Sequence, residues 1–402
     1  MRIKAKFILH TGVCVVLLIG GGCGRVIVNP TSSPTTVLAA SNCGDVVGCG
    51  AKGDGVTDDT AAILGAYSST PVGGTLLIPL AQAGGCFKVT EPIVITKAIS
   101  VEGAGWSAGS WGMHFGEEGF LSHFSGSVIC STVTSGTAFT VASPAAGLHY
   151  SNFAVVGPGS GTSTGVSFGD AAGSQYLNQG TVNNVFSGNF GNPILIFSQN
   201  STYDSLKVDG AAADGSLPDG AGVYMASTDS GTSNANHFSG IVIAGGNHVN
   251  LFAQGQSNDF AGLDLENPAP NDPTAVSLYS YNCNACTFST GYVESAAGQT
   301  YTGENILVDG PATHANSIGA TFINMHISGG PMSLHFEHAT HTTVIGGQMG
   351  RIVIDSTAGP TNLYTVDFDS LVDNTVGSHG NGSNILTESG TWAGSNPHTL
   401  GR

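Results

Sequence analysis

The most informative part of the sequence reads GAKGDGVTDDTAAILGAYSS at residues 50–69, GGTLLIP at residues 73–79 and FKVTEPIVITKAISVEGAG at residues 87–105. The Gly-Asp-Gly run at 53–55 predicts a tight turn, because glycine adopts left-handed backbone angles without strain. Thr57 or Asp58 is a candidate helix cap, and a short helix is expected from Asp58 to about Ser68. Short apolar or alternating runs bounded by glycines follow, which is typical of β-strands.

This order of turn, short helix and GGTLLIP strand resembles the start of pectate-lyase-like proteins, in particular the rhamnogalacturonase and epimerase-type pectate lyase domain. That family also includes exo-glucanases and phage tailspikes. The resemblance implies an all-β fold, a single-stranded right-handed parallel β-helix whose open N-terminal end is covered by a short capping α-helix. Only the opening segment carries the resemblance, so it indicates a fold family and a glycan substrate rather than one reaction.

The composition agrees with a chain of many turns and one domain. Of 402 residues, 60 are glycine and only 9% are charged, and the formal net charge is −17. Repeat folds grow along one axis, so this length predicts one domain rather than two or three. The acidic balance argues against nucleic acid as a partner, because binding nucleic acid requires a basic surface.

The N-terminus has the features of an export signal. Basic residues at positions 2, 4 and 6 precede an apolar run over 7–19 that is too short for a membrane span. Three glycines then precede Cys23, which resembles the lipobox of bacterial lipoproteins, and we expect a lipid on Cys23. The predicted segments are a lipoprotein-like signal peptide over 1–22 and a Pro/Ser/Thr-rich tether over 23–42. Cleavage after Ala39 or Ala40 is the alternative.

These features predict an exported protein, either a cell-surface lipoprotein or a secreted or periplasmic protein, that meets a membrane only through the lipid. The β-helix domain is expected over 43–402, with the cap at about 50–70 and an irregular tail at about 376–402. Six cysteines fall in this domain, an even number in an oxidising compartment, so disulfides are expected. Cys283 and Cys286 have no second pair at zinc-ligand spacing, which favours a local link or free thiols.

A degenerate repeat of roughly 20 to 35 residues, a period typical of solenoids, begins at Ser151. Six segments align as strands with a period of two, and they start at Ser205, Gly240, Gly262, Thr290, Asn324 and Thr365. In this register the second and fourth residues, such as Leu263 and Leu265, point inward and stack into hydrophobic columns. The third and fifth residues point outward. Thr343 to Gly346 also resembles a strand, so a further coil is expected between the last two segments.

The outer columns bring together three candidate catalytic carboxylates, Asp264, Glu266 and Glu294. Neighbouring strands lie about 4.8 Å apart, and residues two apart in one strand lie about 6.6 Å apart. Carboxyl groups of glycosidases lie about 5 to 5.5 Å apart in retaining enzymes and about 6.5 to 9.5 Å apart in inverting enzymes. A like charge this close raises the pKa of its neighbour and creates a proton donor. The pattern therefore predicts a glycoside hydrolase that cleaves a polysaccharide.

Substrate-binding residues are expected beside these carboxylates in the same columns. Tyr292 offers a ring for sugar stacking, and His326 offers a group that hydrogen-bonds or transfers protons. Lys207 and Asp209 come from an earlier segment of the alignment.

An aromatic loop at 105–124 contains Trp106 and Trp111, which either line a sugar subsite or pack over the side of the helix. His335, His338 and His341 are spaced three apart, a spacing that gives no common face in a β-strand. We therefore expect ordinary surface histidines there and no metal site.

Other functions stay open beside hydrolysis. A polysaccharide lyase of this fold would use calcium with a Lys or Arg base, and converging carboxylates suit calcium. Lys207 is the sole candidate cation on this face, however, which favours hydrolysis with no required cofactor. A non-catalytic glycan binder or adhesin would use the same face, and the carboxylates would then be solvated surface residues. A tailspike-like trimer conflicts with the lipoprotein-like start, so a monomer is expected.

The polygalacturonase branch of the family would carry the signatures Asn-Thr-Asp, Asp-Asp, Gly-His-Gly and Arg-Ile-Lys. None is present as such. No catalytic residue is therefore transferred from that branch.

Overall fold

A computed structural model of the chain divides into two units, Met1–Ala39 and Ala40–Arg402. The described residues are 9–10, 13–14, 43–108, 124–143, 145–211, 220–228, 231–245, 247–269, 272–294, 303–311, 317–355, 357–359, 361–373, 384–386 and 389–392. In the first unit they form only two short strands, β1 (Leu9–His10) and β2 (Val13–Cys14). The rest of the predicted signal peptide, the tether and Cys23 lie outside the described residues. No helix among those described is long and apolar enough to cross a membrane.

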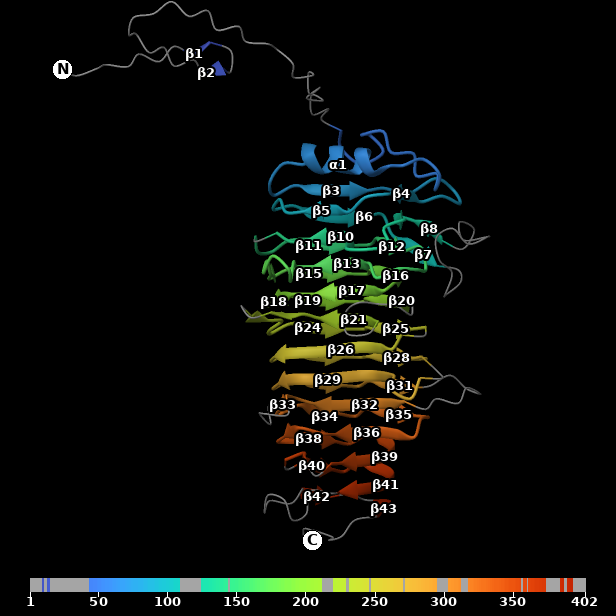
Figure 1. Ribbon diagram of the computed structural model, residues 1–402, viewed down its shortest axis with the longest axis vertical. Coiled ribbons are helices and arrows are strands. Elements are labelled where there is room, and N and C mark those ends of the chain that lie inside the picture. The colour runs from blue at the N-terminus through green and yellow to red at the C-terminus, as the bar shows by residue number, and fades with distance from the viewer. Residues whose placement is uncertain are drawn as a thin grey trace, which may run out of the picture. The chain divides into compact units, whose positions relative to one another are not determined.

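The second unit is a right-handed parallel β-helix, as the resemblance implied, and its coils follow one another in chain order (Figure 1). One side of the coils is a parallel sheet of 12 strands. Its strands are β3 (Thr75–Ile78), β6 (Ser100–Gly103), β11 (His149–Ser151), β15 (Thr181–Asn183), β19 (Thr202–Asp204), β24 (His237–Ser239), β27 (Asp259–Ala261), β30 (Thr287–Ser289), β34 (Thr321–Ile323), β38 (Thr342–Ile345), β40 (Thr361–Tyr364) and β42 (Asn384–Leu386).

A 21-stranded sheet supplies the other two sides. We call the first of them the acidic face; its strands are β4 (Phe87–Val89), β9 (Val128–Ser131), β12 (Ala154–Val156), β16 (Phe186–Phe190), β20 (Lys207–Ala211), β25 (Val242–Ala244), β28 (Asp264–Glu266), β31 (Tyr292–Glu294), β35 (His326–Ser328), the start of β39 (Gln348–Ile354), the start of β41 (Asp367–Asp373) and β43 (Ser389–Trp392).

We call the remaining side the third face. Its strands are β5 (Ile93–Ile95), β10 (Thr137–Val141), β13 (Thr164–Phe168), β17 (Asn192–Ile196), β21 (Ala221–Met225), β26 (Val249–Gln256), β29 (Val276–Asn284), β32 (Glu304–Asp309), β36 (Met332–Phe336) and the ends of β39 and β41.

Four short strand pairs decorate the coils: β7 (Trp106–Ala108) with β8 (Phe124–Gly126), β14 (Leu177–Asn178) with β18 (Ser198–Gln199), β22 (Ser227–Thr228) with β23 (Gly231–Thr232), and β33 (Ser317–Ile318) with β37 (Ala339–Thr340). At the other end of the chain, β42 and β43 pair with β40 and β41. The coils thus continue into the segment for which an irregular tail was predicted.

Among the described residues of the second unit one helix is present, α1 (Thr60–Ser69), and it covers the N-terminal end of the stack (Figure 1). It begins two residues later than predicted. The N-cap position is occupied by Asp59, which makes no side-chain cap bond, and Asp58 just before it accepts a hydrogen bond from the Thr60 amide through Oδ1 at 3.0 Å. The Asp59 carboxylate is buried and accepts bonds from the amides of Lys52 and Gly53 at 2.6 and 3.0 Å. Asp59 therefore holds the glycine-rich turn against the start of the helix.

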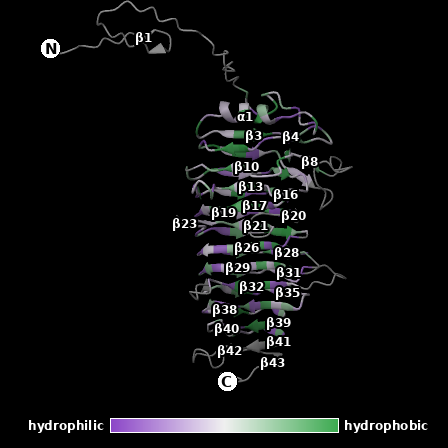
Figure 2. Cartoon of the chain, in the orientation of Figure 1, coloured by the Kyte–Doolittle hydropathy of each residue, from purple (hydrophilic) through white to green (hydrophobic). Residues whose placement is uncertain are grey.

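The inward columns form the core as the alignment predicted. Leu263 is 2% exposed and Leu265 is fully buried. Phenylalanines of the 12-stranded sheet stack face to face inside the coils, with ring centroids 4.5 to 5.0 Å apart, in the order Phe238, Phe260, Phe288 and Phe322. Figure 2 shows hydrophobic and hydrophilic residues mixed along the strands of the stack, as expected when alternate residues face the core and the solvent.

The corner between the 12-stranded sheet and the acidic face contains a left-handed residue with φ between 50° and 64° in nine successive coils, and in one of them Gly347, with φ 92°, follows it. These residues are Asn152, Asn184, Ser205, Gly240, Gly262, Thr290, Asn324, Gly346 and Thr365. Glycine and asparagine adopt this conformation most readily. Six of the nine are the first residues of the segments aligned by sequence.

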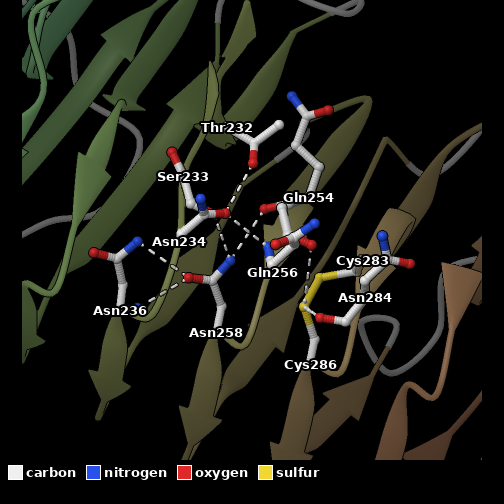
Figure 3. The surroundings of a disulfide bond; sticks show 11 residues. Thr232, Ser233, Asn234, Asn236, Gln254, Gln256, Asn258, Cys283, Asn284 and Cys286 are labelled. Atoms are coloured by element: carbon white, nitrogen blue, oxygen red, sulfur yellow. Dashed lines mark hydrogen bonds between the residues drawn. A yellow bond between two sulfur atoms is a disulfide. The ribbon is translucent and has the colours of Figure 1, made fainter. Parts of the chain in front are cut away.

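Buried amide side chains connect coils at the corner between the third face and the 12-stranded sheet (Figure 3). Asn258 Oδ1 accepts bonds from the backbone amide and from Nδ2 of Asn236, at 3.0 and 3.1 Å. Its Nδ2 donates to the Ser233 carbonyl at 2.9 Å. In the next coil Cys286 takes the equivalent place, since Asp259 pairs with Thr287.

Cys286 forms a disulfide with Cys283, as Figure 3 shows. The other disulfides of the described chain join Cys43 to Cys49 and Cys86 to Cys130. The expectation of disulfides from an even set of cysteines is confirmed, and for Cys283 and Cys286 the local link is the outcome.

Replacing Asn258 by alanine is expected to lower the free energy of unfolding. Asn236 and Ser233 would each lose a hydrogen-bond partner. Each buried polar group left without a partner costs roughly 1–3 kcal/mol. The midpoint of chemical unfolding measures the loss. Thr202→Ala, at an exposed position of a nearby coil, is the control and should change stability by less than about 0.5 kcal/mol. Equal midpoints for the two variants would contradict the role of the amide ladder.

Candidate active site

The strand pairing confirms the predicted register of the acidic face. Asp264 pairs with Tyr292, and Glu266 pairs with Glu294. In the following coil Tyr292 pairs with His326. The three candidate catalytic residues therefore lie on two adjacent strands, directly beside both ring-bearing residues.

A pocket of about 540 Å³ lies on this face at β25 and β28. Asp264 and Glu266 line it, together with Asp209, Val242, Ala244, Gly245 and Asn267. Asp209 is only 3% exposed, so it is a wall residue of the pocket rather than the solvent-facing residue that the outward column predicted. Gly245 and Asn267 also line the pocket. They are the sixth residues of their aligned segments, and the alignment assigned only the third and fifth residues to the outer columns.

A second hollow of about 400 Å³ continues the same face beyond the β31 strand. Its lining runs from His326 to Asp369. The predicted extra coil is present here, since Gln348 pairs with both His326 and Asp367. Thr343 to Ile345 belongs to the same coil but lies in the 12-stranded sheet as part of β38. Asp367 is thus separated from His326 by one strand.

Asp264 and Glu266 are protonated more readily than ordinary carboxyl groups. Burial, followed by the nearby charge of Glu294, raises the pKa of Asp264. Burial, followed by the charges of Asp264 and Glu294, raises the pKa of Glu266. Oδ1 of Asp264 is buried and has no hydrogen-bond partner among the described atoms.

The carboxyl groups of Asp264 and Glu266 also act on each other directly, because their hydrogen-bonding interaction raises the pKa of Glu266 and lowers that of Asp264. This interaction favours a proton on Glu266 rather than on Asp264. Glu294, on the neighbouring strand, remains the third carboxylate of the group.

Tyr292 and His326 form a stacked pair of rings beside the carboxylates. Their rings stack with centroids 5.2 Å apart and an interplanar angle of 6°. The Tyr292 hydroxyl donates to the Glu294 carboxylate, and this hydrogen bond raises the pKa of Tyr292. Tyr292 is 37% exposed, so its surface is open to a ligand.

Lys207 and Trp106 form a separate group at the N-terminal side of the pocket. The Lys207 Nζ lies 5.8 Å from the Trp106 ring centroid, within cation–π distance. Trp106 packs on Phe186 at 5.0 Å and donates through Nε1 to the Asn184 carbonyl at 2.9 Å. Trp106 is half-buried, which agrees with the packing alternative. Trp111 lies outside the described residues.

The prediction of surface histidines is wrong for His335. His335 is 8% exposed, and its Nδ1 lies 3.1 Å from both carboxylate oxygens of Glu304. It is buried because β32, β36 and β39 stack around it, which spacing within one segment does not reveal. His338 is paired with Asp309 at 2.9 Å.

No protein-family model and no curated protein match this chain. Among solved structures, the chain is similar to the A-module of mannuronan C-5 epimerase AlgE4 from Azotobacter vinelandii, with 15% identity and a TM-score of 0.48 over 88% of this chain and 97% of that one. It is also similar to PfbA, a surface adhesin of Streptococcus pneumoniae, with 10% identity and a TM-score of 0.47 over 89% and 96%.

A third similar structure is ORF18 of Geobacillus virus E2, with 19% identity and a TM-score of 0.44. The match covers 82% of this chain but only 61% of that one, so this chain spans less than two thirds of its length. The chain is a right-handed parallel β-helix. The likeness to these three structures concerns the fold.

Glu266→Gln is expected to raise thermal stability at neutral pH but not at acidic pH. A carboxyl group whose pKa is higher in the folded than in the unfolded chain makes folding less favourable as the pH rises from its ordinary value of 4.5 through the folded value. Glutamine does not ionise, so the variant avoids this decrease in stability. Melting temperatures of variant and wild type should therefore converge below this window and separate above it.

The exposed Glu91, changed to glutamine, is the control for this measurement. The melting temperature of Glu91→Gln should differ little from that of the wild type at every pH. A Glu266→Gln difference that does not change between pH 4 and pH 8 would contradict the raised pKa.

Proposed function

We propose that the protein is a glycoside hydrolase that binds a polysaccharide along the acidic face and cleaves it beside Glu266. The observation that carries this proposal is the grouping of Asp264, Glu266 and Glu294 on two adjacent strands, with raised pKa values for the first two. Glycoside hydrolysis needs one protonated carboxyl group and one ionised carboxylate near the same bond.

Glu266 is the proposed general acid. It lines the pocket, and burial together with two like-charged neighbours keeps it protonated to higher pH than an ordinary glutamate. Its proton would pass to the oxygen of the leaving sugar. Glu294, one strand away at about 4.8 Å along the stack, is the proposed nucleophile or base. Asp264 stabilises the proton on Glu266 through their hydrogen bond and adds negative charge where an oxocarbenium-like transition state develops.

The stacked rings of Tyr292 and His326 are the proposed sugar subsite next to the bond that is cleaved. Aromatic rings bind the apolar face of a sugar, and the Tyr292 hydroxyl orients Glu294. The hollow that runs from His326 to Asp369 would hold further sugar units on that side. Lys207 and Trp106 would contact the chain at the other end of the pocket.

A neutral or weakly charged polysaccharide fits this face best. Asp209, Asp264, Glu266 and Glu294 all contribute carboxyl groups, and they would repel a polyanion. Elimination from a uronic acid requires a base such as Lys or Arg, and Lys207 is directed to Trp106. Hydrolysis is therefore favoured over a calcium-dependent lyase reaction. We further propose that the enzyme is exported as a monomer and held at the cell surface through Cys23 and the tether.

Glu266→Gln is expected to reduce the release of new reducing ends from a cleaved polysaccharide by at least about 100-fold, because loss of general acid catalysis costs roughly 10²–10⁴-fold in rate. Incubation with a panel of neutral and acidic polysaccharides measures reducing ends and unsaturated products together. Glu102→Gln, an exposed carboxylate in the 12-stranded sheet, is the matched control and should keep full activity.

The products of that screen distinguish a hydrolase, a lyase and a binding module. Unsaturated products would show a lyase. Retention of a polysaccharide with no product would show a binding module. Full hydrolysis by Glu266→Gln would remove Glu266 from the reaction.

A further inference from the structure

A second group of ionisable residues lies on the third face, away from the proposed active site. It centres on His335 of β36, whose side chain is 10% exposed. Its Nε2 lies 3.9 Å from Glu337 Oε1 and 3.7 Å from Asp355 Oδ2. The ligand atoms of these three residues all lie within 4.8 Å of one another.

Three successive coils hold this geometry in place. Glu304 lies on β32, His335 on β36, and Asp355 directly follows β39. The backbone amides of Glu337 and Asp355 donate to the carbonyls of Val308 and Phe336, each at 2.9 Å. The inter-coil hydrogen bonds therefore fix the positions from which both carboxylates extend.

Glu304 determines which nitrogen of His335 is available. Its carboxylate lies 3.1 Å from Nδ1 with both oxygens, so Nδ1 carries the proton and donates it to Glu304. The lone pair of Nε2 is then directed toward Glu337 and Asp355. The distances from Nε2 to those oxygens exceed a hydrogen bond. Nε2 is within ion-pair distance of both carboxylates but hydrogen-bonds to neither, and a cation between the three groups would complete this arrangement.

We propose that His335 Nε2, Glu337 and Asp355 bind one divalent transition-metal ion of the zinc type, with Glu304 as the positioning residue. An imidazole ligand favours zinc and its neighbours in the first transition row over calcium or magnesium, which prefer oxygen ligands alone. Ligands about 2.0–2.2 Å from zinc in a tetrahedron lie roughly 3.3–3.6 Å apart. The two separations from His335 Nε2, 3.9 and 3.7 Å, need to close by only a few tenths of an ångström, and the oxygens of Glu337 and Asp355 start within 4.8 Å of each other.

The exposure of the ligands leaves room for an ion and a water molecule. Glu337 and Asp355 side chains are 34% and 40% exposed, whereas His335 is nearly enclosed. Neighbouring Asp309 already bonds to His338 at 2.9 Å and to the Tyr279 hydroxyl at 3.0 Å. We therefore assign the ion to the His335 group. Because its ligands come from two coils and its positioning residue from a third, the bound ion would stabilise the C-terminal coils, independently of the proposed hydrolysis.

Zinc titration of the untagged, metal-stripped chain tests this proposal. One Zn²⁺ per chain should bind and raise the melting temperature, since a ligand of the folded state stabilises it. Co²⁺ should bind in its place with the visible absorption bands of a nitrogen- and oxygen-ligated ion. Asp355→Asn, at a partly exposed position, should weaken zinc binding at least tenfold while leaving the melting temperature of the metal-free chain nearly unchanged.

Two further variants distinguish the role of a direct ligand from that of the positioning residue, and a control variant tests for nonspecific zinc binding. His335→Gln should abolish binding, and Glu304→Gln should weaken it roughly 10–100-fold, as loss of an outer partner of a metal ligand does. His237→Gln is the matched control, because His237 also bonds a carboxylate, Asp259, at 2.8 Å but is exposed. Zinc binding that is absent, that persists in Asp355→Asn, or that is lost in His237→Gln would overturn the proposal. Binding of Ca²⁺ in preference to Zn²⁺ would overturn it as well.

Discussion

Parallel hydrogen bonding between successive coils is the constraint on which the rest of this molecule depends. It places each outward residue directly beside the equivalent residue of the next coil, at about 4.8 Å. Asp264, Glu266 and Glu294 are therefore held together by the backbone and cannot move apart as loop residues could. The raised pKa values of Asp264 and Glu266 follow first from partial burial and then from the neighbouring carboxylates that this pairing holds close.

The same constraint explains why so much of the acidic face could be predicted from the sequence. A period of two assigns each residue to the core or the outside, and Leu263 and Leu265 are buried as that period requires. Asn, Gly, Ser and Thr recur at the first aligned position because that position is the left-handed corner of each coil. The sequence pattern located the corner residue without revealing its backbone conformation. Local geometry repeated from coil to coil is readable in a single sequence.

Features that depend on side-chain rotation or on irregular spacing could not be predicted. The interaction between the Asp264 and Glu266 carboxyl groups depends on the rotamers of both side chains, which register alone does not specify. The burial of His335 depends on three coils whose connecting segments differ in length, so sequence spacing gave no indication that Glu304 and Asp355 lie beside it. Stacking places residues together here that no linear motif joins.

The left-handed corner beside the acidic face also bears on how such a protein can change its ligand. An insertion at Gly262 or Thr290 would shift the following strand out of register with its neighbours, because the short turn cannot accommodate an extra residue. The opposite edge of the same face leads into connections of unequal length, such as those from β28 to β29 and from β35 to β36. Whole connections could be exchanged at that edge while the columns stay in place, so recognition and catalysis can diversify on separate sides of one strand.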